Sequence, residues 1–394
     1  MGMHRANSDI ARFARTNFHN KHRVFGIKRA DRRAHMYVVG KTGTGKSTLI
    51  ETLIGQDLES GEGLAVFDPH GDLIQRVLSR VPERRREELI YFNAPDPRQP
   101  LGFNPLEPVP AAKRPLAASA VLDAFKKLWE ESWGPRLEHI LRNALLGLLD
   151  QPSATLADVL PLMMDRDFRR AAVRHMENPQ VREFWSQEYE HYPFNLRATA
   201  IAPIQNKVGA FLADPILNRI LARSEETLNL REIMDQRKIL LVNLAKGKMG
   251  GDASALLGAL LVASIGWTAF GRAELPETDR SDFYVYLDEF HTFTTLSLAD
   301  MLSELRKYRV GLILAHQYTA QLDPPIRDAV FGNAGTIISF RVGPDDARVL
   351  AKEFDPVFSE LDLISLPNHA IYLKLMIDGT PSKPFSAETL PPED

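Results

Sequence analysis

The sequence contains no cysteine among its 394 residues, so it can form neither a disulfide nor a thiolate metal site. This absence is ordinary for a protein of the reducing cytosol. No apolar stretch follows the first basic residues, so no signal peptide is predicted. The most apolar segment, 255–270, contains Gly, Ser and Thr, and it is shorter than the ~20 residues of a membrane span. We therefore expect a soluble, cytoplasmic chain without a membrane span of its own, in which 255–270 is a buried helix.

The charge of the chain is nearly balanced overall but uneven along its length. The formal net charge is −3, which excludes a globally basic protein. Within residues 1–35, however, nine Lys and Arg face only two Asp. This excess predicts a basic N-terminal arm over 1–30, which is either solvated or in contact with nucleic acid or an acidic partner.

Short apolar runs rich in β-branched residues recur along the chain. They are nearly continuous rather than alternating, which is typical of strands buried on both faces of a mostly parallel sheet. Helical patterns separate most of them, so the sequence predicts an α/β fold. The runs occupy 36–39, 64–67, 89–92, 239–244, 283–287, 312–315, 336–340 and 370–375.

Residues 112–232 interrupt this alternation with helical periodicity and almost no strand signal. The Pro-rich segment 102–115 marks the entry to this region. We find no internal repeat or low-complexity tract. The predicted organisation is an α/β domain of 31–111 and 233–380, an all-helical inserted domain of 112–232, and an extended C-terminal tail of 381–394.

A glycine-rich stretch directly follows one apolar run and precedes a helical pattern. Phosphate needs many donors that converge on one concavity, and glycines let backbone N–H groups turn inward while a helix N-terminus adds positive potential. Lys46 is expected to reach the β- and γ-phosphates, and Ser47 to bind Mg²⁺. A glycine-rich turn without a ligand is the alternative, and the flanking strand and helix disfavour it. The stretch is Gly40-Lys41-Thr42-Gly43-Thr44-Gly45-Lys46-Ser47-Thr48.

Two acidic residues, Asp288 and Glu289, follow the apolar run 283–287. Asp288 is expected to hold Mg²⁺ through its water shell, and Glu289 to act as the general base on the attacking water. A strand ending in a solvated acidic turn is the alternative, but a phosphate-binding loop needs such an acidic partner. The stretch DPHGD at 68–72 contains the DxxG string of signalling GTPases, yet no Asn-Lys-x-Asp follows, so a GTPase is disfavoured.

The order GKTGTGKST, DPHGD, FNPL, helical insertion, LDEF and an apolar strand ending in Gln resembles the HerA/FtsK superfamily of ring ATPases. The chain is most similar to type IV secretion and conjugative coupling proteins (TraD/TraG-like), over roughly residues 25–375. The resemblance implies a RecA-like motor domain, ATP and Mg²⁺ as cofactors, a homo-hexameric ring, and DNA passed through its centre. Coupling proteins usually begin with membrane-spanning helices, and this chain has none. It is therefore expected either to be recruited to the inner membrane face by a membrane-bound or secretion-machine partner, or to be a soluble translocase.

The resemblance also assigns roles around the strand at 312–315. It implies that Gln317 lies near the γ-phosphate, and that Arg306, eleven positions earlier, reaches the site of the neighbouring subunit as an arginine finger. Arg309 is the second candidate for that role, and the absence of any finger in this stretch stays open. Lys307 is expected to complement the dipole at a helix C-terminus. His316 has no partner at metal-ligand spacing and is expected to be structural.

Two weaker features stay open between alternatives. Arg136 and Arg142 lie on a predicted helix and either face solvent or reach nucleotide or DNA. Lys246 and Lys248 follow an apolar run among glycines and could face nucleotide, a neighbouring subunit or DNA.

The motifs together favour an ATP-dependent DNA translocase, of unknown strandedness, related to conjugative coupling proteins. The alternatives are a protein-handling secretion ATPase of the same superfamily, a soluble HerA-like DNA-processing translocase, and a nucleotide-binding scaffold without turnover. The complete set of motor residues, from Lys46 to Gln317, argues against the scaffold.

Overall fold

The computed structural model describes residues 9–17, 22–223 and 225–392, which form two compact units. The sheet unit contains the described residues up to Phe92, Arg231–Leu244 and those from Ala269 on. The helical unit contains Asn93–Leu230 and Ala245–Thr268, and therefore extends beyond the predicted insertion on both sides. Periodicity in the sequence identifies a buried helix, but it does not reveal which unit the helix packs into.

An eleven-stranded sheet organises the sheet unit, in the order β2-β1-β13-β10-β9-β3-β8-β7-β4-β6-β5. The six neighbouring strands from β9 to β6 run parallel, which confirms the predicted α/β fold with a mostly parallel sheet. A separate pair, β11 and β12, runs antiparallel. The strands are β1 (Ile10–Thr16), β2 (Val24–Lys28), β3 (Met36–Val39), β4 (Gly63–Asp68), β5 (Leu89–Asn93), β6 (Ile239–Asn243), β7 (Phe283–Leu287), β8 (Val310–His316), β9 (Thr336–Ser339), β10 (Ala370–Lys374), β11 (Met376–Ile377), β12 (Thr380–Pro381) and β13 (Phe385–Thr389).

The register of the parallel strands brings their carboxyl ends to one edge of the sheet. Val39 of β3 lies opposite His316 of β8, and Leu287 of β7 lies opposite Phe67 of β4. The loops that follow parallel strands meet at such an edge, where ligands of open α/β sheets bind. The glycine-rich loop, the acidic pair and the glutamine singled out in the sequence are therefore neighbours.

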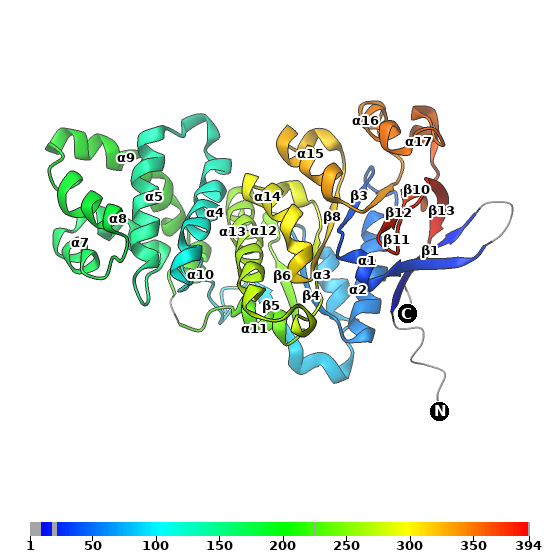
Figure 1. Cartoon of the computed structure of the whole chain (residues 1–394), viewed down its shortest axis with the longest axis horizontal. Helices are drawn as coiled ribbons and strands as arrows, with labels where there is room; N and C mark the ends of the chain where they lie inside the picture. Colours follow the sequence, from blue (N-terminus) through cyan, green and yellow to red (C-terminus); the bar gives the residue numbers. More distant parts are fainter. Residues whose placement is uncertain (1–8, 18–21, 224, 393–394) are drawn as a thin grey trace. The chain divides into compact units, whose positions relative to one another are not determined.

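The other side of the sheet is antiparallel. It combines β1 and β2, the first described strands, with β13, the last one. β13 lies between β1 and β10 and pairs antiparallel with each of them. Figure 1 shows β1 in blue beside β13 in red, and Arg15 of β1 forms an ion pair with Glu388 of β13 at 2.8 Å. The described part of the predicted basic arm is thus a hairpin of the sheet, and the predicted tail contains a sheet strand. Residues 1–8 and 18–21 of the predicted arm lie outside the described residues.

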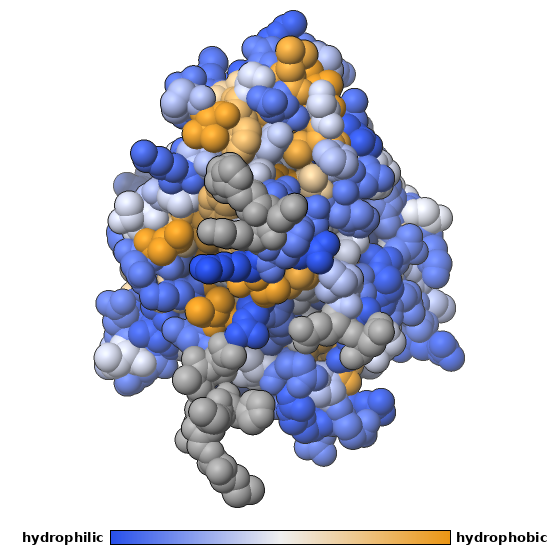
Figure 2. All heavy atoms as spheres, turned by 90° about the vertical axis from the view of Figure 1, so that its right-hand side faces the viewer, coloured by the Kyte–Doolittle hydropathy of each residue, from blue (hydrophilic) through white to orange (hydrophobic). Residues whose placement is uncertain are grey.

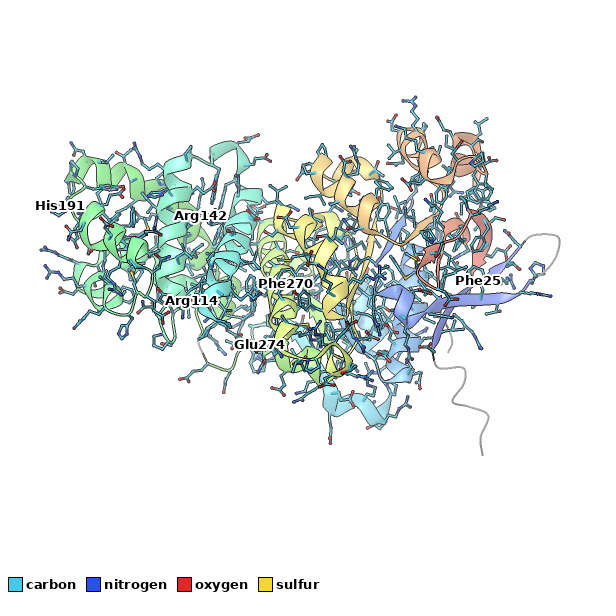
Figure 3. All side chains as sticks on the ribbon, in the orientation of Figure 1. Phe25, Arg114, Arg142, His191, Phe270 and Glu274 are labelled. Carbon is cyan, nitrogen blue, oxygen red and sulfur yellow. The ribbon has the colours of Figure 1, made fainter. Side chains whose placement is uncertain are left out.

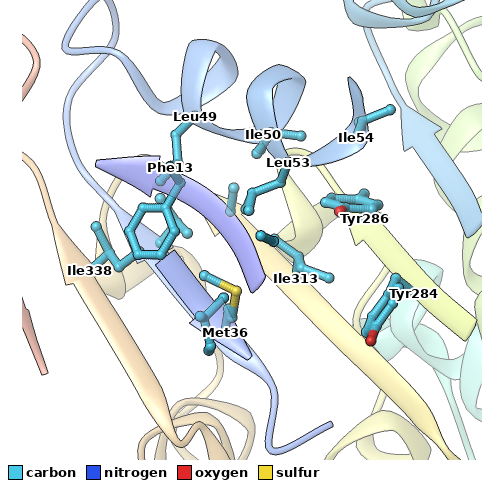
Figure 4. Packing of buried hydrophobic residues seen from close by; sticks show 14 of the residues in the cluster. Phe13, Met36, Leu49, Ile50, Leu53, Ile54, Tyr284, Tyr286, Ile313 and Ile338 are labelled. Atoms are coloured by element: carbon cyan, nitrogen blue, oxygen red, sulfur yellow. The ribbon is translucent and has the colours of Figure 1, made fainter. Parts of the chain in front are cut away.

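Helix α2 packs on the parallel part of the sheet and forms the centre of the core (Figure 4). Leu49, Ile50, Leu53 and Ile54 repeat with helical spacing, and each is at most 1% exposed. Burying a side chain of this kind contributes about 1.5–3 kcal/mol, as an upper estimate. The helices of the sheet unit are α1 (Arg29–Arg32), α2 (Lys46–Ser60), α3 (Asp72–Leu78), α11 (Leu230–Asp235), α14 (Leu296–Glu304), α15 (Pro324–Asn333), α16 (Pro344–Phe354) and α17 (Glu360–Ser365).

A fully buried ion pair lies inside the core of the sheet unit. Arg32 donates to both carboxylate oxygens of Asp57, at 2.7 and 2.8 Å, and also to Tyr286 Oη at 2.6 Å. Its guanidinium lies 3.8 Å from the ring centroid of Tyr284. Burial alone would lower the pKa of Arg32, but the charge of Asp57 outweighs it and holds that pKa well above its usual value. The pair is favourable only while both partners are present.

Figure 2 shows the side of the molecule that lies at the right in Figure 1. Hydrophilic residues dominate this view, and hydrophobic residues gather mainly toward its top, the level at which Figure 1 places α16 and α17. Val357 and Leu361, just before and within α17, are 47% and 74% exposed. Most of the remaining surface in this view is hydrophilic, with smaller hydrophobic patches at mid-height.

Three short helices of the helical unit, α7, α8 and α10, begin with a side-chain cap. Asp214 caps α10 by accepting from the backbone N–H groups of Ile216 and Leu217. Arg142, labelled in Figure 3, donates to Ser119 Oγ at 2.8 Å and to Glu138 at 3.3 Å within the unit. Its helices are α4 (Arg114–Leu128), α5 (Pro135–Leu149), α6 (Val159–Met164), α7 (Arg166–Val173), α8 (Pro179–Glu183), α9 (Phe194–Ala213), α10 (Pro215–Leu221), α12 (Lys246–Met249) and most of α13 (Gly251–Gly271).

Helix α13 contains the most apolar segment of the sequence. By length and composition, residues 251–274 could cross a membrane, but 89% of their most apolar window is buried in the structure. The prediction of a buried helix at 255–270 is therefore confirmed.

Candidate active site

The glycine-rich loop connects β3 to α2 in a conformation that requires its glycines. Gly43 has φ 76° and Gly45 has φ 120°, both in the region that side chains disfavour. A Cβ atom on Gly40 would lie 2.5 Å from Phe340 Cβ, so the backbones of β3 and β9 could not approach as they do. Lys41 N–H donates to Arg341 O at 2.9 Å and fixes the loop to the segment after β9. The loop is thus held as a cradle in front of the N-terminus of α2.

Lys46 begins α2 and folds back over the loop. Its Nζ donates to the carbonyl oxygens of Gly40 at 2.5 Å and of Lys41 at 3.1 Å. Burial lowers the pKa of Lys46, and the negative charges of Glu289 and Asp288 oppose this effect. Ser47 and Thr48 are half-buried in the same turn, whereas Lys41, Thr42 and Gly43 are exposed. The ammonium group is therefore placed where phosphate oxygens could replace the two carbonyls.

Asp288 lies at the carboxyl end of β7, next to the end of β4. Its backbone N–H donates to Phe67 O at 3.2 Å. Burial, with the charges of Asp68 and Glu289, raises the pKa of Asp288 to about 7, while Lys46 acts in the opposite direction. Negative charge at this edge therefore exceeds what the surrounding protein compensates.

That excess charge fits a bound divalent cation. Mg²⁺ keeps several waters and takes only one or two protein carboxylates, and Asp288 and the Ser47 hydroxyl are donors of the required kind. Within the described ranges, no group of three or more His, Cys, Asp or Glu is arranged to hold a metal by itself. Ser47 and Asp288 would share the ion with water and with phosphate.

Asp68 belongs to this edge although the sequence did not single it out as a site residue. Its carboxylate accepts from the backbone N–H groups of His70 at 2.8 Å and Ile74 at 3.2 Å. These bonds fix the DPHGD loop, and its charge contributes to the raised pKa of Asp288. The sequence did carry a signal for Asp68, which follows the apolar run 64–67. Its proximity to Asp288 could not be predicted, however, because the sequence does not show that β4 and β7 are neighbouring strands.

The side chains of Glu289 and Gln317 are in contact. These residues follow β7 and β8, which are neighbouring parallel strands. Gln317 Nε2 donates to Glu289 Oε1 at 2.8 Å. Glu289 is 7% exposed and has φ 48°, an uncommon conformation for a residue with a side chain. Its second oxygen, Oε2, accepts no hydrogen bond in the described part of the chain.

His316 is fully buried at the end of β8 and is bonded to the core. Its Nε2 lies 2.6 Å from Tyr37 Oη. Burial lowers the pKa of His316 to about 3, and the nearby His291 and Lys46 add to this effect. These contacts fit the structural role expected for it.

Arg306 lies at the opposite edge of the sheet, because it precedes β8 whereas the glycine-rich loop follows the parallel strand β3. It is exposed, and in the part of the chain that the structure describes no hydrogen bond or ion pair holds its guanidinium. It lines two adjoining cavities of about 380 and 960 Å³. Lys307 pairs with Glu304 at 2.7 Å, and Arg309 adopts φ 58° at the turn into β8. Arg306 is thus separated from the phosphate site of its own chain.

The two lysines that follow β6 are exposed on the short helix α12 of the helical unit. Lys246 lies at the start of this helix, and Lys248 in the same turn. Arg136 is exposed at the start of α5.

Comparison with known proteins identifies the fold and the family. The structure is similar to the bacterial conjugative coupling protein TrwBdeltaN70, with a TM-score of 0.67 and 16% identity over 94% of this chain and 87% of that one. It is similar to plasmid coupling protein TrwB in complex with the ATP analogue ADPNP (TM-score 0.65, 17% identity, 92% and 86% covered). It is also similar to VirB4 of Thermoanaerobacter pseudethanolicus (TM-score 0.62, 13% identity, 98% and 96% covered). The fold is that of a RecA-like P-loop NTPase.

No curated protein sequence matches the chain. The family model described as the type IV secretion-system coupling protein DNA-binding domain matches residues 24–342. Because this match covers most of the sequence, the chain belongs to the family of type IV secretion-system coupling protein DNA-binding domains.

Proposed function

We propose that the chain is a Mg²⁺-dependent ATPase that translocates DNA as a homo-hexameric ring, in the role of a conjugative coupling protein. One observation carries this proposal. Lys46, Asp288, Glu289 and Gln317 meet at one edge of the sheet, while Arg306 lies at the other and has no side-chain partner among the described residues. This arrangement supports a hydrolytic site that the first four residues would form in part, and that Arg306 of a neighbouring subunit would complete.

Nucleotide binding follows from the contacts of the loop. The triphosphate would replace the carbonyl oxygens of Gly40 and Lys41 as partners of Lys46 Nζ. Backbone N–H groups of the loop and of the first turn of α2 would supply further donors. Ser47 and Asp288 would hold Mg²⁺, which when bound neutralises phosphate charge. Binding would relieve the excess negative charge around Asp288.

Hydrolysis needs a base beside the γ-phosphate. Glu289 would take a proton from water while the water oxygen bonds to the γ-phosphorus and the bond from this phosphorus to the bridging oxygen breaks. ADP and phosphate leave. Gln317, 2.8 Å from Glu289, joins the base to the end of β8.

The position of Arg306 supports the proposed ring. A guanidinium is a permanent, forked cation suited to the charge on a transferred phosphoryl group, and such a finger supplied in trans can accelerate hydrolysis by about 10³–10⁵. Arg306 lies at the wrong edge for its own site, and the cavities of about 380 and 960 Å³ beside it leave room for an incoming neighbour. Copies arranged head to tail would complete each other's sites.

The proposals for the cargo and for the partner rest on the family to which the chain belongs. Its model is described as a DNA-binding domain, and the TrwB structures are described as those of a conjugative coupling protein. We propose DNA as the cargo and a membrane-bound secretion machine as the partner that recruits the protein to the inner membrane face. TrwB is described in complex with both a GTP analogue and an ATP analogue, so ATP and GTP should be compared directly.

The test is ATP hydrolysis with and without single- and double-stranded DNA, together with the mass of the assembly in ATP and Mg²⁺. Hydrolysis should rise with at least one form of DNA, and the mass should correspond to a hexamer. Lys46→Ala is the control, since it removes the phosphate-binding ammonium. An ATPase activity that no form of DNA changes, together with no detectable DNA binding, would exclude a DNA motor. Stimulation by a secretion partner alone would assign a protein cargo.

A further inference from the structure

The carboxylate of Glu289 is contacted from a second side by a residue of its own turn. Glu289 adopts φ 48° and ψ 48°, and the next three residues form a short 3-10 helix closed by the bond from Thr292 N–H to Glu289 O at 2.9 Å. This reversal returns His291 toward the acid. Its Nδ1 lies 3.5 Å from Glu289 Oε2, the oxygen that Gln317 does not contact.

The contacts of Gln321 determine which nitrogen of His291 carries the hydrogen. Gln321 Oε1 accepts from the backbone N–H groups of Gln317 at 3.3 Å and Tyr318 at 3.2 Å, so its amide nitrogen must point the other way. That nitrogen lies 3.2 Å from His291 Nε2. An amide nitrogen only donates, so Nε2 accepts and the ring hydrogen lies on Nδ1. His291 therefore directs a donor at Glu289.

These contacts close a ring around the general base. Gln317 donates to one carboxylate oxygen, His291 faces the other, and Gln321 joins His291 to the backbone of Gln317. The segment that carries both glutamines is itself anchored, because the N–H and Oγ1 of Thr319 both donate to Asp346 Oδ1 at 2.8 Å. Its position is thus fixed by α16.

We infer that His291 is a positioning residue for Glu289 in hydrolysis, an inference that rests on the proposed function. A carboxylate that takes a proton from water must present one oxygen in a defined direction, and catalytic hydrogen bonds that are long in the free enzyme tighten in the working complex. Nδ1 of His291 lies 3.5 Å from Oε2, and in the working complex this contact would shorten to a hydrogen bond and so fix Oε2. Release of Oε1 by Gln317 when nucleotide binds then leaves Oε1 for the water, with the base still held.

Two amide substitutions distinguish the roles of the two ring nitrogens of His291. The side-chain amide of Asn places a donor near the position of Nδ1, whereas the longer Gln reaches that of Nε2. His291→Leu should lower kcat by about 10- to 100-fold, the range typical of residues that orient a catalytic group, with unchanged affinity for ATP. His291→Asn should restore most of kcat and His291→Gln should not. His175→Asn, on an exposed histidine of the helical unit, is the matched control and should leave kcat unchanged.

The outcomes separate this inference from the function on which it rests. A wild-type protein that hydrolyses no ATP refutes the proposed function. An active wild type together with an equally active His291→Leu refutes the positioning role alone. Equal recovery by His291→Asn and His291→Gln also refutes it, since the donor at Nδ1 would not matter. A fall in ATP affinity parallel to the fall in kcat would make His291 a structural residue. If His291→Leu fails to fold, the difference in kcat between His291→Asn and His291→Gln still tests the positioning role.

Discussion

Replacing Asp288 by Asn should stabilise the nucleotide-free protein while it abolishes Mg²⁺-dependent hydrolysis. Burial, with the charges of Asp68 and Glu289, raises the pKa of Asp288 from 3.8 to about 7. That difference corresponds to about 4 kcal/mol of folding free energy once the carboxyl is ionised in both states. Asn keeps the oxygen that accepts from Glu289 N–H at 3.1 Å. Its amide hydrogens can face the neighbouring carboxylates, so no new unpaired charge is created.

The stabilisation should grow with pH. Below about pH 4 the folded and unfolded chains both carry a protonated Asp288, and the group contributes nothing. As pH rises from there to about 7, the unfolded chain has lost the proton that the folded chain retains, so the stability of the wild type falls. Above that window the penalty is complete and constant. Asn does not titrate, so the variant avoids the loss.

Urea unfolding in EDTA, without nucleotide, measures the effect. Between about pH 5 and pH 8 the stability advantage of Asp288→Asn should widen by about 3 kcal/mol. Asp300→Asn, on an exposed carboxyl of α14, is the control and should show no such widening. An advantage that does not change with pH, or a variant less stable than the wild type at the upper pH, would refute the reasoning.

Three further predictions follow from contacts described above. Glu289→Gln should retain ATP affinity in equilibrium binding and lose about 100-fold or more of phosphate release, because an amide cannot take a proton; normal turnover would contradict the assignment of the base. Arg306→Ala and Lys46→Ala subunits should recover part of the ATPase activity when mixed, because each completes a site that the other lacks; verified mixed rings without recovery would remove the trans role. Asp57→Ala should cost about 3–5 kcal/mol in urea unfolding, because the charge of Arg32 is left buried without its partner; a loss below about 1 kcal/mol would contradict the buried pair.

The parallel half of the fold could be predicted because its signal is local. Every residue of β3, β4 and β8 is buried, and each of these strands contains a continuous apolar run, although β4 ends in Asp68 and β8 in His316. The antiparallel half could not be predicted from the same rule. In β1 the buried residues Ala11, Phe13 and Ala14 are interspersed with the exposed Arg12 and Arg15, and a register shift between Arg12 and Ala14 breaks strict alternation. The charges of β1 that suggested a solvated arm are therefore the exposed face of a strand.

The candidate site was predictable where a motif is contiguous. The loop from Gly40 to Ser47 and the pair Asp288-Glu289 carry their chemistry in adjacent residues, and the structure places them at one edge. Asp68 and His291 were missed because their roles depend on which strands are neighbours and on how one turn reverses. Neither property has a local signal in the sequence.

The order of the sheet has a consequence for the making of the protein. The hairpin of β1 and β2 is synthesised long before β13, the strand that joins it to the rest of the sheet. The ion pair between Arg15 and Glu388 cannot form until Glu388, 373 positions later, has been synthesised. Until β13 has been synthesised, the nascent chain therefore carries a hairpin with an unpaired edge, of the kind that promotes association with other chains. A chain truncated before β13 would therefore leave the hairpin of β1 and β2 without the strand that docks it on the sheet.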